Sequence, residues 1–417
     1  MRLKRWAVFL GMILYLGLAL RASFLVGITI TVLVILCLAA AWNNHSLRGV
    51  IYRRIFVYHR AFPGEEFPVG IEIENRKILP LSWLRIIDPW PREVAPQDQE
   101  FLALSNTNEM GYLTHVFSLL GYQRRRKNYA LLHRKRGIYQ VGPAVLETGD
   151  IFGIFNSQRE VGEAEQLTVF PHLLPAPALN MQTDNPFGDK RSRRRIYEDP
   201  NLPMGIRDYH PEDSFRHIHW PATARAGQVQ VKVFQPTSEQ ILMLCLNVST
   251  SQRYWEGVYP ALLEQLLGIA AGLVSQGIHS GYRVGMISNG CLANSDQPFR
   301  IPAGRSPQQL GRLLEALAGV SPVVVAPFER FLLREAPRVP YGATLLILTA
   351  IYSDDLAETL LRLKKHERRM TLISLAEQPP AAIPGVPNVH LPFHSAVTDE
   401  EASSPAKREW PSQEVYP

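Results

Sequence analysis

The sequence predicts a multidomain protein with an N-terminal pair of apolar helices, an all-β sandwich domain and an α/β domain. Its 417 residues exceed the roughly 100–200 that one domain usually takes. Residues 6–42 form a long apolar run, and residues 51–170 carry the pattern of short strands. From Ile241 onward, strands alternate with helices. These three changes of pattern define the predicted architecture.

Composition already excludes several classes of protein. Hydrophobic residues make up 46% and charged residues 20% of the chain, as in ordinary globular proteins, so disorder or a fibrous fold throughout is excluded. Three cysteines are too few for a disulfide framework or a cysteine-based zinc or iron–sulfur site. A mean hydropathy of -0.06 excludes a transporter with many membrane spans.

The apolar run predicts a transmembrane helical hairpin. As one helix, residues 6–42 would be roughly 55 Å long, nearly twice the hydrocarbon thickness of about 30 Å. Two crossings, at about residues 6–20 and 23–42, fit better, with Arg21 at the turn reaching the far headgroups. Trp6 and Trp42 would then lie at one interface.

Basic residues on both sides of the run predict its orientation. Such residues stay in the cytoplasm, so the soluble part is expected on the cytoplasmic side of the inner membrane. They are Arg2, Lys4, Arg5, Arg48, Arg53 and Arg54. A cleaved signal peptide is one alternative, although Ala19, Leu20 and Arg21 make a poor cleavage site. A single span with the soluble part outside is another.

Strand patterns predict the β-sandwich. Residues 67–75 and 137–141 alternate apolar and polar side chains, and Gly, Pro and Asn separate the runs. Short strands over about 120 residues, without a long amphipathic helix, are typical of two packed sheets.

The C-terminal half predicts a largely parallel sheet covered by helices. Continuous apolar runs are typical of strands buried on both faces, and helical spacing of leucines separates them. The expected strands are 241–248, 282–288, 343–349 and 370–375, and the expected helices are 259–276, 307–317 and 354–367. Ligands of such sheets bind beyond the carboxyl ends of strands. The polar residues expected there are Asn247, Ser249, Ser251, Ser288, Asn289 and Thr349.

A segment dense in charged and aromatic residues, 205–225, lies between the two soluble domains. Asp213 and Arg216 are three residues apart and can pair on a helical surface. One interpretation is an interdomain ion-pair network that joins the sandwich to the α/β unit. Its residues are Arg207, Tyr209, Asp213, Arg216, His219, Trp220 and Arg225.

This segment closely resembles the signature of the Domain of Unknown Function 58 family. The family pattern runs Arg-x-Tyr, Gly-Asp, Arg-x-Ile-(Asp or His)-Trp and Ala-Arg, followed by a short strand. Here residues 207–225 and 229–234 occupy those places, with Glu212 where glycine is usual. Residues 136–139 and 149–155 resemble two upstream elements of the family, with Ile151 in place of proline.

The resemblance covers about residues 5–390, and it implies a type of protein, a fold and a partner. It implies a bacterial or archaeal membrane protein whose C-terminal domain is similar to the von Willebrand factor A domain, a Rossmann-like fold. It also implies association with a AAA+ ATPase of the MoxR type and no assigned enzymatic activity. The expected divisions are 1–48 hairpin, 49–175 sandwich, 176–238 signature segment and linker, 239–395 A-like domain, and 396–417 disordered tail.

A metal site in the A-like domain is not expected. Such domains hold Mg²⁺ with an Asp-x-Ser-x-Ser loop, a threonine and a second aspartate, because hard cations prefer oxygen ligands. In this sequence Asn247 replaces the first aspartate, and Ala350 stands where the second is expected. The degenerate loop Asn247, Ser249 and Ser251 is therefore expected to cap the following segment through its serines.

Other catalytic sites are also not expected, and neither is a cofactor. His210, His217 and His219 invite a zinc interpretation, but 217 and 219 point in different directions on a helix. The sequence has no Gly-x-Ser-x-Gly elbow and no Walker A loop, and no catalytic Cys/His pair can be placed in it.

Clustered basic residues account for much of the net charge of +6. The clusters, 124–127, 133–136 and 190–195, can form a solvated face, contact anionic membrane lipids or bind an acidic protein. Without interleaved aromatic residues, no nucleic-acid partner is expected.

Three functional hypotheses follow. The first is a membrane-anchored, non-enzymatic scaffold or adaptor that works with a MoxR-type ATPase through its A-like domain. The second is a hydrolase or metal-dependent enzyme that uses the Asp/His-rich junction, including Asp208, Asp213, His217 and His219. The third is a cell-envelope binding module, which requires the soluble domains to lie outside. The sequence leaves the oligomeric state open.

Overall fold

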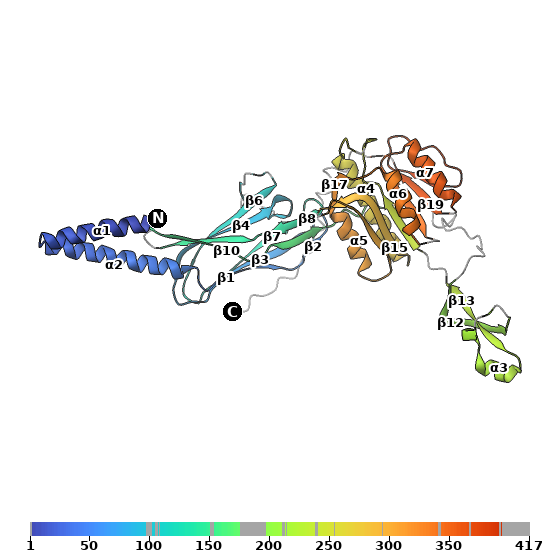
Figure 1. Ribbon diagram of the computed structural model, residues 1–417, viewed down its shortest axis with the longest axis horizontal. Coiled ribbons are helices and arrows are strands. Elements are labelled where there is room, and N and C mark those ends of the chain that lie inside the picture. Colours follow the sequence, from blue (N-terminus) through green and yellow to red (C-terminus); the bar gives the residue numbers. More distant parts are fainter. Residues whose placement is uncertain are drawn as a thin grey trace. The chain divides into compact units, whose positions relative to one another are not determined.

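The chain divides into two compact units after Phe170. The computed structural model (Figure 1) describes residues 2–96, 102–104, 107, 109–150, 154–175, 197–210, 213, 215–237, 241–253, 255–293, 295–340, 343–366, 368–391 and 393. The predicted tail, residues 396–417, and the basic cluster 190–195 lie outside the described residues. The first unit holds two helices and a β-rich region, and the second holds a β-hairpin and an α/β domain.

Two N-terminal helices, α1 (Arg2–Ala19) and α2 (Ser23–Ser46), lie side by side. Arg21 lies in the connecting turn with a left-handed φ of 48°, which confirms the predicted turn. Gly17 permits a close approach, because a Cβ there would lie 2.8 Å from the side chain of Leu25. α2 is long and apolar enough to cross a membrane, with a mean hydropathy of 2.8 and 11% of its most apolar window buried.

The β-rich region contains three hydrogen-bonded sheets. Their orders are β1-β3-β7, β10-β9-β4-β6-β5 and β2-β11-β8, where β2 and β11 are parallel. The strands are β1 (Val50–Phe56), β2 (Arg60–Ala61), β3 (Glu66–Asn75), β4 (Leu81–Pro91), β5 (Leu102–Leu104), β6 (Met110–Leu119), β7 (Arg124–Leu132), β8 (Gly137–Val141), β9 (Ala144–Gly149), β10 (Asn156–Val161) and β11 (Glu165–Val169), with a short helix η1 (Arg92–Val94) after β4.

One apolar core joins these sheets. Ile71 and Ile73 of β3, Leu84 and Ile86 of β4, and Leu146 of β9 are all buried in it. The structure therefore has three sheets around this core, not the two that were predicted. The chain changes sheet between β8 and β9 at Gly142, whose φ of 86° favours glycine.

A separate β-hairpin carries the predicted signature segment. It pairs β12 (Tyr197–Asp208) with β13 (Gln230–Thr237), with Arg207 opposite Val231. Between the strands lie a short helix η3 (Phe215–His217) and α3 (Trp220–Ala226). α3 begins at the N-cap His219 and ends at Gly227, whose φ of 69° allows the left-handed C-cap.

The α/β domain is a seven-stranded sheet in the order β16-β15-β14-β18-β19-β20, with β17 paired to β15. β14 (Ile241–Leu246), β15 (Arg283–Leu292), β18 (Thr344–Thr349), β19 (Arg369–Ser374) and β20 (Asn388–His390) are parallel. β16 (Pro298–Gly304) and β17 (Val320–Val324) run antiparallel to β15. The prediction of a largely parallel sheet is confirmed.

Helices cover both faces of this sheet (Figure 1). One face carries α4 (Pro260–His279) and α5 (Gln309–Ala318), and the other carries α6 (Phe328–Glu335), η4 (Ala336–Arg338) and α7 (Asp354–Lys365). α4 also has the length and hydropathy of a membrane span, but 61% of its apolar window is buried. That burial identifies α4 as a core helix.

Candidate functional site

Four of the six polar residues predicted at the carboxyl edge of the α/β sheet form a hydrogen-bonded network: Asn247, Ser249, Asn289 and Thr349. Asn247 Nδ2 donates to Thr349 Oγ1 at 3.0 Å, and Asn247 Oδ1 accepts from Asn289 Nδ2 at 3.1 Å. The same Oδ1 accepts from the backbone N–H of Ser249 at 3.1 Å. Asn289 Oδ1 in turn accepts from the N–H of Val248 at 2.9 Å. The three strands β14, β15 and β18 thus bring the predicted residues together.

This network is neutral, buried and largely satisfied by its own members. Asn247 is 4% exposed, and both Asn289 and Thr349 are 0% exposed. Thr349 Oγ1 donates to the carbonyl of Ile351 at 2.7 Å, so its oxygen is already engaged. Ala350, buried beside it, supplies no carboxylate. The oxygens that would face a cation are used inside the protein, which disfavours Mg²⁺ at this edge.

The prediction that Ser249 and Ser251 cap the segment after the loop is wrong, because another residue has this role. Ser251 Oγ donates to the carbonyl of Gly257 at 3.2 Å. Thr250 Oγ1, which the sequence did not single out, accepts from the N–H of Tyr259 at 2.6 Å, just before α4. Ser288 Oγ accepts from the N–H of Gly290 at 3.1 Å and takes no part in the network described above. A continuous polar loop offers several equivalent donors, so spacing could not select the correct hydroxyl.

Arg207 and Asp213 form the central ion pair of the hairpin. Arg207 Nη1 and Nη2 donate to the two oxygens of Asp213 at 2.7 and 2.5 Å, and the N–H of His210 donates to Asp213 at 2.9 Å. The Arg207 bonds, and then the His210 bond, lower the pKa of Asp213 to about 2, so this carboxylate stays ionised at neutral pH. The predicted pair of Asp213 with Arg216 stays a prediction, because the side chain of Arg216 lies outside the described residues.

Aromatic side chains are exposed around this ion pair. Phe215 is 75% and Trp220 is 68% exposed, while Tyr209 stacks on Phe215 with ring centroids 5.9 Å apart. α3 has no buried residues, and Arg225 in its last turn is exposed. We call Tyr209, Phe215 and Trp220 the aromatic surface of the hairpin. Exposed aromatic residues beside an arginine are typical of protein-binding surfaces.

One histidine of this segment, His219, has a local structural role. His219 Nδ1 accepts from the N–H of Ala222 at 3.0 Å and so caps α3. Among the described residues no group of three His, Cys, Asp or Glu side chains could hold a metal ion.

The structure reveals a buried charged cluster that sequence reasoning missed. Asp88 accepts from Tyr52 Oη at 2.6 Å, from Arg54 Nη2 at 2.7 Å and from Trp90 Nε1 at 2.9 Å. The side chains of Arg54 and Asp88 are 1% and 0% exposed. Burial, together with the Asp88 carboxylate, raises the pKa of Tyr52 far above its usual range. Arg54 was counted among the basic residues that predict the orientation of the apolar run, but its side chain is enclosed in the β-rich core.

The described basic clusters are partly neutralised. Arg124 on β7 pairs with Glu72 on β3, and Lys135 Nζ lies 3.2 Å from Glu93 Oε1. Arg134 donates to the carbonyl of Arg92 at 2.9 Å. These contacts compensate part of the positive charge of the two described clusters.

Comparison with known proteins finds a family match in the second half of the chain. Residues 205–403 match the family described as protein of unknown function DUF58. The DUF58 match begins at the hairpin and includes the α/β domain. The uncharacterized protein YeaD of Bacillus subtilis is 22% identical over 219 residues, 51% of this chain and 52% of that protein. The chain thus spans about half the length of this curated relative.

Two similar solved structures share little with this chain. A CARDB domain from Pyrococcus furiosus is 9% identical over 29% of this chain and 91% of that chain, with a TM-score of 0.19. The sporulation control protein Spo0M of Bacillus subtilis is 15% identical over 30% of this chain and 50% of that chain, also with a TM-score of 0.19. TM-scores this low do not indicate a shared fold or function.

Proposed function

We propose that this protein is a membrane-anchored adaptor, without enzymatic activity of its own, that works with a AAA+ ATPase of the MoxR type. In this proposal α1 and α2 form a transmembrane hairpin, and the seven-stranded domain is a divergent von Willebrand factor A-like fold. The observation that carries the proposal is the closed polar network of Asn247, Asn289 and Thr349. Because these polar groups hydrogen-bond to one another, they are not available as metal ligands, and this edge of the sheet has a structural role.

Membrane attachment is supported by the surface of α2. Its 24 residues are long enough to cross about 30 Å of hydrocarbon, and most of their apolar side chains are exposed within the chain. Exposed apolar surface of this extent is unfavourable in water. With Arg54 buried, Arg48 and Arg53 are the exposed arginines that follow α2 and favour a cytoplasmic location for the soluble domains.

The aromatic surface of the hairpin is the proposed docking surface for the ATPase. A two-stranded hairpin has little core of its own, and here Ile218 and Val231 are its buried apolar residues among those described. The bidentate Arg207–Asp213 pair holds Asp213, two residues before Phe215, against β12. Rigidly presented aromatic side chains contribute strongly to protein interfaces.

The test is binding of the detergent-solubilised full chain to the purified MoxR-type ATPase of the same cell. Trp220→Ser should weaken binding by about tenfold or more, because it removes an exposed aromatic anchor. Trp255→Ser is the matched control, since Trp255 is 69% exposed but lies outside the hairpin, and it should bind like the unaltered chain. Absence of binding by the unaltered chain, or equal binding by both variants, would contradict the proposal.

A further inference from the structure

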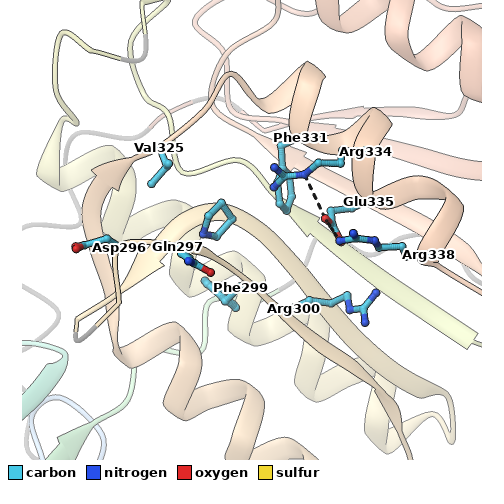
Figure 2. Close-up of a pocket in the computed structure, with 10 residues that line it drawn as sticks. Asp296, Gln297, Phe299, Arg300, Val325, Phe331, Arg334, Glu335 and Arg338 are labelled. Carbon is cyan, nitrogen blue, oxygen red and sulfur yellow. Dashed lines mark hydrogen bonds and ion pairs between the residues drawn. The ribbon is translucent and has the colours of Figure 1, made fainter.

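A groove beside the edge strand β16 is lined by three arginines and two aromatic rings. It has a volume of about 580 Å³ and lies between residues 296–300, at the start of β16, and residues of α6 and η4 (Figure 2). Arg300 comes from β16, Arg334 from α6 and Arg338 from η4. No motif in the sequence points to these residues.

Glu335 holds two of the arginines in place. Its side chain is 7% exposed, and its Oε1 lies 2.9 Å from Arg338 Nη1 and 3.5 Å from Arg334 Nε. The guanidinium of Arg334 also lies over the ring of Phe331, 5.9 Å from its centroid. Figure 2 shows Glu335 between the two arginines that share it. A nearly buried carboxylate thus fixes both guanidinium groups, which lowers the entropy lost when they bind an anion.

The groove has an excess of positive charge. Arg300, Arg334 and Arg338 face two carboxylates, Asp296 and Glu335, so one positive charge remains. Arg300 makes no ion pair within the described part of the chain. A charged guanidinium without a partner favours a carboxylate or phosphate, with which it can form two parallel hydrogen bonds.

Apolar surface lies next to these charges. Phe299 is 8% and Val325 is 44% exposed, and both line the groove with Phe331. This combination suits an acidic side chain beside an apolar one. The small charge excess and the carboxylate of Asp296 disfavour a polyphosphate. Pro298 and Pro302 on β16 disfavour recognition by added backbone pairing, because proline has no N–H to donate.

We propose that this groove binds an acidic peptide segment of a partner protein. A Glu or Asp side chain pairs with Arg300 and Arg338, and a neighbouring apolar side chain packs against Phe331 and Val325. The groove belongs to the α/β domain alone, so this proposal does not depend on membrane attachment or on the identity of the ATPase. Binding is electrostatic in part and should weaken as the salt concentration rises.

The test is fluorescence anisotropy with the full chain in detergent and a fluorescein-labelled Glu-Leu-Glu-Glu-Leu peptide. Saturable binding is expected, with at least about a tenfold loss of affinity in Arg300→Gln, because a charge-assisted bidentate contact is removed. Arg300 is exposed and unpaired among the described residues, so the variant should fold normally. The control Arg312→Gln alters an exposed arginine of α5 on the opposite face of the sheet and should not change affinity.

Two further measurements test whether the groove selects a carboxylate over other ligands. The matched Gln-Leu-Gln-Gln-Leu peptide should not bind, because it lacks carboxylates. Inorganic phosphate should compete only through ionic strength, to the same extent as chloride at equal ionic strength. Equal binding of the Gln peptide, specific displacement by phosphate, or an unaffected Arg300→Gln variant would each overturn the proposal.

Discussion

Asp88 has no exposed surface, yet it accepts hydrogen bonds from Tyr52, Arg54 and Trp90. An isolated charge is costly to bury, and here the opposite charge of Arg54 and the neutral donors together satisfy the carboxylate. Gly142 allows this arrangement, because a Cβ at that position would lie 2.1 Å from Arg54 Nη2. The cluster links β1 to β4, which belong to different sheets.

Removing the charge of Asp88 should therefore destabilise the β-rich region strongly. We expect Asp88→Asn to lower the free energy of unfolding by about 3–5 kcal/mol, since Arg54 would lose its buried partner. The matched control is Glu147→Gln, which removes an ion pair with Arg85 at 3.6 Å, where Arg85 is 51% exposed; the loss there should be at most about 1 kcal/mol. Hydrogen exchange at the backbone amides of β1 and β4 measures the loss of stability in each variant. Equal effects of the two variants would contradict this assignment.

At the scale of elements, the C-terminal end of α2 is fastened to the β-rich region. Lys77 Nζ donates to the carbonyl of Ser46, Ser157 Oγ donates to that of Asn43 at 3.2 Å, and Arg159 Nη1 donates to that of Leu47 at 3.4 Å. The last carbonyls of a helix have no partner within it, so these side chains satisfy them. The helix and the adjacent sheets are thereby held together.

Lys77→Ala should loosen this end of α2. Ser46 is 0% exposed, so its carbonyl would be left buried without the Lys77 donor, at a cost of about 1–3 kcal/mol. Faster hydrogen exchange is expected at residues 44–50, with the core strands β3 and β4 unchanged. Arg76→Ala, the control, removes an exposed pair with Glu74 and should leave the helix end protected. Unchanged exchange in Lys77→Ala would show that the other two bonds suffice.

Elements were predictable where one local pattern dominates. The strands β14 and β18 are buried on both faces and read as continuous apolar runs, and α4 has regularly spaced leucines. β16 and α6 were missed, because β16 carries two prolines and α6 has eight residues. Strand patterns did not show how the β-rich region divides into sheets.

Sites were less predictable than elements, because partners depend on the fold. The network of Asn247, Asn289 and Thr349 was found, since parallel strands bring their carboxyl ends to one edge. The buried ion pair of Arg54 was not predicted, because its partner Asp88 is distant in sequence and on another strand. The groove with Glu335 combines residues from two separate segments, and no short motif unites them.

At the scale of the molecule, we propose an apolar membrane anchor, a β-rich region fastened to it, and a second unit with one binding surface on its β-hairpin and another on its α/β domain. The first surface is the aromatic surface of the hairpin, and the second is the arginine-lined groove. Neither requires a metal or a cofactor. The central claim is that α1 and α2 attach the chain to a membrane and leave every soluble part in the cytoplasm.

The most direct test is protease digestion of the full chain, tagged at its C-terminus, in bacterial membranes of known orientation. The tag should sediment with membranes, resist protease in intact spheroplasts and be digested in inverted vesicles. A variant without residues 2–46, as a control, should leave the membrane fraction. Digestion of the tag in intact spheroplasts, or recovery of the unaltered chain in the soluble fraction, would contradict the account.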